Sequence, residues 1–256
     1  RDCLLSRGLG DVYKRQVIFL SDLYKMPHIS YIILNIIILI LTIILCGKGF
    51  LKGKQLIIKI AGIILFVLVI VNRFSITIYD NVIASKDASW WELLPNSICG
   101  LSSLLLALAI ILGKEDNWIL NSASYLGFFG SAIVIFYPDF LITQPFFSIR
   151  SITGLLHHSL MNLLIIVMMI TGYIKPSRTK FKYLIIMMAF YMTYGIFLID
   201  ALGIDNAMQI GKPLIKNAPI LTSWYVVFLA TAVVTYLYEW LFDFFRQKSK
   251  KNSLFR

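Results

Sequence analysis

Seven apolar segments of helix-spanning length follow one another between residues 29 and 244, and this pattern constrains the fold more than any other feature. An α-helix rises about 1.5 Å per residue, so roughly 20 apolar residues cross a hydrocarbon layer about 30 Å thick. Because 59% of the residues are hydrophobic and only 14% are charged, an ordinary water-soluble domain is excluded. The sequence therefore predicts an all-α, polytopic membrane bundle of about seven transmembrane helices. The predicted helices span residues 29–46, 56–79, 93–112, 118–137, 151–173, 182–204 and 219–244.

The first sixteen residues differ in composition from the rest of the chain. They contain three arginines and no isoleucine, whereas the later residues are rich in isoleucine and use mainly lysine. We therefore interpret residues 1–16 as a non-native segment left by cloning, and exclude it from fold arguments. Residues 17–246 are predicted to form a single transmembrane domain, and residues 247–256 a basic cytoplasmic tail.

Lysine and arginine alternate between the two predicted membrane faces. The connections assigned to one face, together with the adjoining helix ends and the C-terminal tail, carry 14 basic residues, and those on the other face carry 5. Since short cytoplasmic loops are enriched in lysine and arginine, the N-terminus is predicted outside and the C-terminus inside, as a multi-pass protein of the cell membrane. The basic residues lie in separate loops rather than along a groove, so membrane lipids, and not nucleic acid, are the expected partners. The oligomeric state is left open.

Polar residues on four predicted helices share one depth, in the outer third of the membrane. These residues are Asn72, Arg73, Cys99, His158 and Asp200. An arginine at the centre of a membrane helix costs roughly 2.5–3.5 kcal/mol, so a partner for Arg73 is expected. Asp80 or Asp200 could pair with it. Alternatively, Arg73 could hold a lipid phosphate or an anionic substrate.

Helical spacing places polar residues on one face of two of these helices. On the third predicted helix they are Asn96, Cys99 and Ser103, and on the fifth they are Gly154, His158 and Asn162. His157 is turned about 100° away from His158, towards the side of Thr153 and Met161. We therefore expect His158, rather than His157, to face a shared cavity.

A cysteine and a histidine at one depth suggest thiol chemistry. A neighbouring imidazole can take the proton of a thiol and create a thiolate nucleophile, which could accept an acyl chain from a lipid. The alternative is structural, because a buried cysteine commonly packs as a small hydrophobic residue. With three histidines, two of them adjacent, and no metal-binding motif, neither a metal site nor a cofactor is predicted.

At these residues the chain resembles the YwaF-type integral membrane family, whose eukaryotic relatives include a transmembrane phospholipid acyltransferase. The resemblance rests on LLPNSICGL in the third predicted helix and RSITGLLHHS at the fifth, where Arg150 stands eight residues before His158. It implies that Cys99 carries the acyl group and that His158 assists it.

The leading hypothesis is a thiol-dependent lipid acyltransferase with its site in the outer half of the bilayer. Cys99 and His158 are its predicted catalytic residues. The predicted substrate-binding residues are Asn72, Arg73, Asn96, Arg150, Asn162 and Asp200. The alternative is a transporter or ligand-binding membrane protein that uses the same polar layer. Near the inner face, Glu239 and Asp243 are interpreted as solvated interfacial residues.

Overall fold

The computed structural model describes residues 26–49, 53, 55–83, 90–142, 145–212, 220 and 223–253. Within these residues the chain is all-helical and contains no strand, which confirms the predicted fold class. Seven α-helices are present in the described part: α2 (Met26–Gly47), α3 (Gln55–Ile78), α4 (Ile98–Leu112), α5 (Trp118–Phe136), α6 (Ile149–Thr171), α7 (Phe181–Asp200) and α8 (Trp224–Ser253). Short helical turns lie at Tyr79–Ile83, Trp90–Leu93, Asp139–Ile142, Arg178–Lys180 and Ala207–Gln209. By length and composition, six of the described helices can cross a membrane, whereas α4 is shorter.

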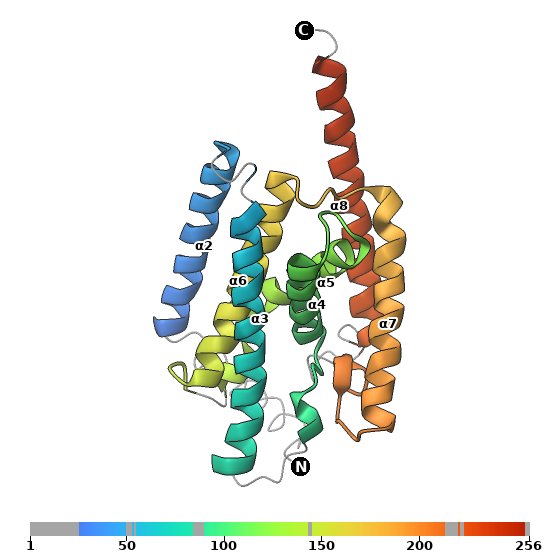
Figure 1. Ribbon diagram of the computed structural model, residues 1–256. Helices are drawn as coiled ribbons and strands as arrows, with labels where there is room; N and C mark the ends of the chain where they lie inside the picture. Colours follow the sequence, from blue (N-terminus) through green and yellow to red (C-terminus); the bar gives the residue numbers. More distant parts are fainter. Residues whose placement is uncertain are drawn as a thin grey trace, which may run out of the picture.

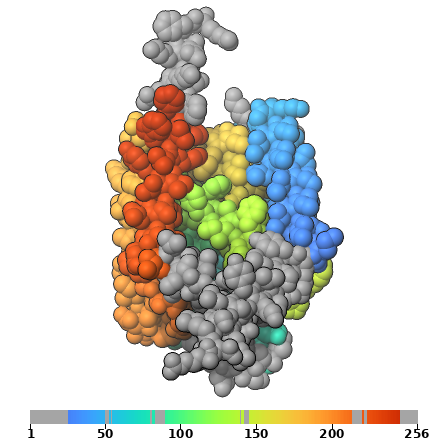
Figure 2. All heavy atoms as spheres, turned by 180° about the vertical axis from the view of Figure 1, so that it is seen from behind, coloured from blue at the N-terminus to red at the C-terminus, as the bar shows by residue number. Residues whose placement is uncertain are grey.

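The helices form an elongated bundle with α4 and α5 at its centre (Figure 1). Helix α5 contacts α4, α6, α7 and α8, while α2 packs mainly against α6 at the periphery. Seen from behind, α2 and α8 lie on opposite sides of the molecule (Figure 2). The helix ends that the charge pattern assigns to the cytoplasm gather at the upper end of Figure 1, beyond which α8 continues. This common alignment places the polar residues of different helices at comparable depths.

Small side chains on α5 allow α4 and α6 to approach closely. A Cβ on Gly127 would lie 2.9 Å from the Met161 sulfur of α6 and 3.4 Å from the Ser102 Cβ of α4. Ala123 and Ser131, one turn away on either side, are fully buried. Because association in lipid depends on close van der Waals contact, this stripe makes α5 the packing core of the bundle.

The third predicted helix begins five residues later than expected, at Ile98 rather than residue 93. Pro95 disfavours helical geometry at the preceding residue and cannot donate a backbone hydrogen bond. Ser97 then caps α4, because its extended backbone lets its hydroxyl accept a hydrogen bond from the Gly100 N–H at 3.1 Å. Asn96 therefore lies in the segment before α4, and not on a helical face with Cys99.

The predicted ends of the last two helices are also displaced. Helix α7 stops at Asp200 rather than at residue 204, since Gly203 adopts a left-handed φ of 67° and its N–H binds the Ile199 carbonyl at 3.1 Å. Helix α8 begins at Trp224 and continues to Ser253, past the expected end at residue 244. Part of the segment interpreted as a basic tail is therefore helical. Residues 1–16 lie outside the described residues.

Asp116 joins two connections at the end of the bundle assigned to the cytoplasm. Its Oδ1 accepts hydrogen bonds from the Lys175 N–H at 2.8 Å, from Lys180 Nζ at 2.5 Å and from Asn121 Nδ2 at 3.1 Å. Partial burial of Asp116 tends to raise the pKa of its carboxyl, but these donors outweigh burial and hold the pKa below its usual value. Asp116 thus ties the α4–α5 connection to the α6–α7 connection.

The Asp116 carboxylate is expected to make stability depend on pH. Because its pKa is lowered in the folded state, its stabilisation is present above the unfolded pKa near 4 and is lost as the pH falls through the folded value. Asp116 has a left-handed φ of 55°, which asparagine also tolerates, so Asp116→Asn should keep the backbone and cost about 1–2 kcal/mol at neutral pH. Thermal unfolding followed from pH 7 downward should show a smaller pH dependence in this variant.

Asp205→Asn is the matched control for this prediction. Asp205 forms an ion pair with Lys212, but both side chains are largely exposed, so its loss should cost little. Equal destabilisation by the two substitutions would contradict a special role for Asp116.

Candidate functional site

Arg73 joins α3 to the segment that precedes α4. Its Nη2 donates a hydrogen bond to the Leu94 carbonyl and another to Asn96 Oδ1 at 2.7 Å. Among the described residues, Glu92 and Arg150 are charged groups that act on it electrostatically. The expected ion pair between Arg73 and Asp200 is therefore wrong, because Asp200 is the last residue of α7 and its side chain is exposed. The side chain of Asp80, the other expected partner, lies outside the described residues.

Asn72 joins α3 to the first turns of α6. Its side-chain nitrogen donates to the Arg150 carbonyl at 3.0 Å and to Thr153 Oγ1 at 2.9 Å. The Asn72 side chain is buried, where lipid offers no hydrogen-bond acceptor, so these two bonds satisfy its amide hydrogens. The Arg150 side chain is half-buried at the same level.

His157 and His158 are both buried, with 5% and 6% of their surface exposed. The His157 Nδ1–H donates to the Thr153 carbonyl at 3.0 Å, which fixes its tautomer. The two rings lie against each other, with centroids 3.9 Å apart. His158 Nδ1 has no hydrogen-bond partner within the described part of the chain. The expectation that only one imidazole is turned inward is therefore too simple, although His158 is the ring with a free nitrogen.

Cys99 lies in the first turn of α4 and rests directly on α5. A Cβ added to Gly130 would lie 2.4 Å from the Cys99 sulfur, so the absence of a side chain there makes room for the thiol. The thiol is half-buried, and it also acts electrostatically on the Tyr191 hydroxyl of α7. Neither Cys99 nor Cys46 forms a disulfide.

The faces that carry Cys99 and the histidines meet one turn deeper. Ser103, one turn along α4 from Cys99, donates its hydroxyl hydrogen to the Cys99 carbonyl at 2.8 Å, and its oxygen lies 3.1 Å from the Met161 sulfur of α6. Met161 in turn lies one turn from His157 and His158. On the neighbouring side of α6, Asn162 donates to Ser131 Oγ of α5 at 3.1 Å. Helices α4 and α6 therefore present the thiol and the imidazoles above a shared contact with α5.

The structure thus brings most of the predicted residues into two connected groups. The first group contains Asn72, Arg73, Asn96 and Arg150, and lies at the ends of α3 and α6 that the charge pattern assigns to the outside. The second group, around α5, contains Cys99, His158 and Asn162. Arg73 also acts electrostatically on His157, which links the groups. Asp200 belongs to neither group.

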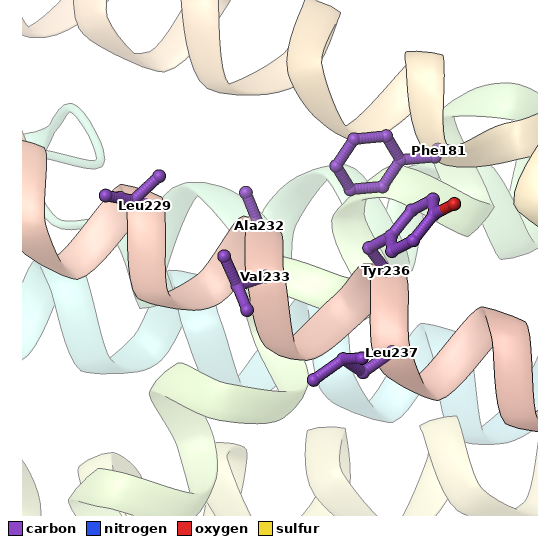
Figure 3. Close-up of a pocket in the computed structure, with 6 residues that line it drawn as sticks. All are labelled: Phe181, Leu229, Ala232, Val233, Tyr236 and Leu237. Atoms are coloured by element: carbon purple, nitrogen blue, oxygen red, sulfur yellow. The ribbon is translucent and has the colours of Figure 1, made fainter.

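A shallow apolar groove lies elsewhere, between α7 and α8 (Figure 3). It has a volume of about 290 Å³, and the Phe181 ring of α7 faces the Tyr236 ring of α8 across it. The remaining lining residues are Leu229, Ala232, Val233 and Leu237. None of the predicted site residues lines this groove.

Sequence reasoning missed the position of Glu239. Its side chain is fully buried on α8, so its interpretation as a solvated interfacial residue is wrong. Asp243, one turn further, is the member of the pair that meets polar groups at the surface, where it accepts hydrogen bonds from Arg178 N–H and Ser177 Oγ. Thr235 is the sequence signal that could have indicated this burial. It lies one turn before Glu239, so the two polar residues share one face of the helix.

The long apolar helices pack lengthwise, and they bury polar side chains inside the bundle. These features define a multi-pass helical membrane protein. Among the described residues, no group of three or more histidine, cysteine, aspartate or glutamate side chains is placed to hold a metal ion. The TMEM164 family model matches residues 23–242, and the chain belongs to this family of transmembrane proteins. Neither the curated proteins nor the solved structures give a match to the chain.

Proposed function

We propose that this protein is a lipid acyltransferase of the YwaF type in the cell membrane, with Cys99 as nucleophile and His158 as general base. The observation that supports the proposal is that α4 and α6 meet neighbouring residues of α5: Cys99 rests on Gly130, and Asn162, one turn from His158 on α6, binds Ser131. His158 Nδ1 has no hydrogen-bond partner within the described part of the chain, and in the Nε2–H tautomer it accepts the Cys99 proton once the two side chains come within reach. Asn72 has both of its donor bonds satisfied, and it holds the first turn of α6 in place.

The reaction divides into two balanced steps. In the first, His158 takes the Cys99 proton and the thiolate attacks the ester carbonyl of a donor phospholipid. The ester C–O bond breaks, a thioester forms, and the departing lysophospholipid oxygen takes the proton from His158. In the second, His158 deprotonates the hydroxyl of an acceptor lysophospholipid, and its oxygen attacks the thioester carbonyl. The C–S bond breaks, the new ester forms, and the Cys99 thiolate takes the proton back from His158.

Arg73 and Arg150 supply the charge that a phospholipid substrate requires. Two guanidinium groups close enough to repel each other favour an anion between them, and a lipid phosphate at the outer headgroup level carries that charge. Glu92 is an acidic residue near Arg73. Its negative charge leaves one net positive charge on the two arginines, which a single lipid phosphate balances. Asn96 holds the Arg73 side chain in position for this contact.

The proposal is tested by trapping the thioester. The purified protein is incubated with a phospholipid that carries an isotopically labelled acyl chain, quenched in acid and digested. We expect the labelled chain on the peptide that contains Cys99, and its release when lysophospholipid or hydroxylamine is added. Recovery of the label on an oxygen ester, or its absence while lipid acylation proceeds, would contradict the thiol mechanism.

The purified protein, placed in sealed vesicles, also tests the alternative that it is a transporter. A transporter would move a solute across sealed vesicles whether or not the thiol is blocked. Two residues of the polar layer that a transporter would use do not meet, because Asp200 is exposed and Arg73 binds Leu94 and Asn96. Thiol-independent transport without acyl transfer would replace the acyltransferase proposal.

A further inference from the structure

Ser102 of α4 and Tyr191 of α7 form a pair of hydroxyl groups inside the bundle. Their oxygens lie 2.9 Å apart, and both side chains are fully buried. Two hydroxyls carry two hydrogens, but the single hydrogen bond between them uses only one. Neither hydroxyl has another hydrogen-bond partner among the described residues. One buried hydrogen therefore remains available to an acceptor, and an unsatisfied donor at such a position calls for an explanation.

This hydroxyl pair lies one helical turn from the Cys99 thiol, along the contact between α4 and α5. Cys99 rests on Gly130, and Ser102 faces Gly127, where an added Cβ would lie 3.4 Å from the Ser102 Cβ. Cys99 and Ser102 are three residues apart on α4, which separates their levels by about 5 Å. The thiol also acts electrostatically on the Tyr191 hydroxyl, so that hydroxyl is the member of the pair that senses the sulfur from α7.

Acyl transfer at a thiol requires a hydrogen-bond donor that Cys99 and His158 do not supply. When the thiolate attacks an ester carbonyl, negative charge develops on the carbonyl oxygen, and a fixed donor stabilises it. The proton that His158 has taken up is destined for the departing oxygen. Nearby side-chain donors are already engaged, because the Ser103 hydroxyl binds the Cys99 carbonyl and Asn162 binds Ser131.

We propose that Tyr191 is a further catalytic residue, which donates the spare hydrogen of the hydroxyl pair to the oxyanion formed at Cys99. This assignment rests on the proposed acyl transfer. Ser102 is a positioning residue, because its hydroxyl donates to Tyr191 Oη and leaves the Tyr191 hydrogen free to turn towards the reacting carbonyl. A phenol is also more acidic than an aliphatic hydroxyl, so it is the stronger donor of the two.

Tyr191 acts in both steps of the reaction without giving up its proton. As the Cys99 sulfur bonds to the ester carbon, the π electron pair of the carbonyl moves onto its oxygen, which accepts the hydrogen bond. When the bond to the lysophospholipid oxygen breaks, that electron pair returns and the carbonyl re-forms. Attack of the acceptor hydroxyl on the thioester produces a second oxyanion, which the same hydrogen bond stabilises.

Tyr191→Phe keeps the buried ring and removes only the hydroxyl. Thioester formation at Cys99 and acyl transfer to lysophospholipid are followed with the purified full chain in nanodiscs. We expect both rates to fall about 10²–10³-fold, because the oxyanion loses its donor. The KM for lysophospholipid should change little, since the lost interaction is made in the transition state. Tyr125→Phe is the matched control, because it removes the hydroxyl of another tyrosine that is only 2% exposed, and should keep both rates.

Two further measurements separate catalysis from folding. The thioester accumulates without acceptor lipid, and its carbonyl, labelled with carbon-13, is observed by infrared spectroscopy. A hydrogen bond from Tyr191 lowers the carbonyl stretching frequency, so this frequency should rise in Tyr191→Phe. Ser102→Ala should slow the reaction less than Tyr191→Phe does. It should add no further loss when the two substitutions are combined, because Ser102 acts through Tyr191.

The outcomes distinguish this assignment from the acyltransferase proposal on which it rests. A thioester on Cys99 with unchanged rates in folded Tyr191→Phe would overturn the role of Tyr191 and leave acyl transfer standing. The absence of a thioester from the wild-type protein would overturn both. If Tyr191→Phe does not fold, Ser102→Ala decides: a lower rate with a higher carbonyl frequency supports the donor, and unchanged values overturn it.

Discussion

Replacing Cys99 with alanine is expected to reduce acyl transfer by about 10³-fold or more, because the covalent route loses its nucleophile. The thiol makes no disulfide and rests against Gly130, so the smaller side chain should leave the bundle folded. The measurement is transfer of a labelled acyl chain to lysophospholipid by purified protein in nanodiscs. Thermal unfolding of the same samples checks that the loss is chemical rather than structural.

Cys46→Ala is the matched control, because Cys46 is the other cysteine in the described residues, forms no disulfide and lies at the far end of α2. It should keep full activity. His158→Gln should lose most of the rate while Cys99 remains present, since the thiol then lacks its base. Full activity in Cys99→Ala, with the protein folded, would end the acyltransferase proposal.

Gly130→Ala is expected to lower the rate about 10–100-fold with little loss of stability. The new Cβ would lie 2.4 Å from the Cys99 sulfur, which is far inside van der Waals contact. Because the sulfur is the end of a short side chain, it can rotate away at a modest cost to folding. A displacement of about 1 Å at a reacting atom is enough to slow a reaction by roughly 10²-fold.

The rate of maleimide labelling at Cys99 provides a second measurement, in a background in which Cys3 and Cys46 are alanine. A rotated sulfur meets different neighbours, so Gly130→Ala should change that labelling rate together with the enzymatic rate. Gly47→Ala is the control, because no atom lies within 4 Å of the Cβ it would add. Unchanged acyl transfer in Gly130→Ala would show that the position of the thiol is not critical.

The membrane class and most helix positions follow from local sequence. The segment predicted at 118–137 is the helix Trp118–Phe136, and the one at 56–79 is Gln55–Ile78. Long apolar runs specify helices because lipid leaves backbone groups no other way to be satisfied. The start of α4 was misplaced although Pro95 and Ser97 carry the local signal, since an apolar run alone does not mark a helix end.

Composition and spacing alone established that this chain forms a membrane bundle with polar residues at a common depth. Which of those residues meet was decided only by the packing of the helices. Arg73 binds Leu94 and Asn96 rather than Asp200, and Glu239 on α8 is buried rather than solvated. Periodicity gives the direction of a side chain on its own helix, but a polar group in lipid is satisfied by whichever helix packs beside it. That neighbour is set by close contacts such as those around Gly127 and Gly130 on α5.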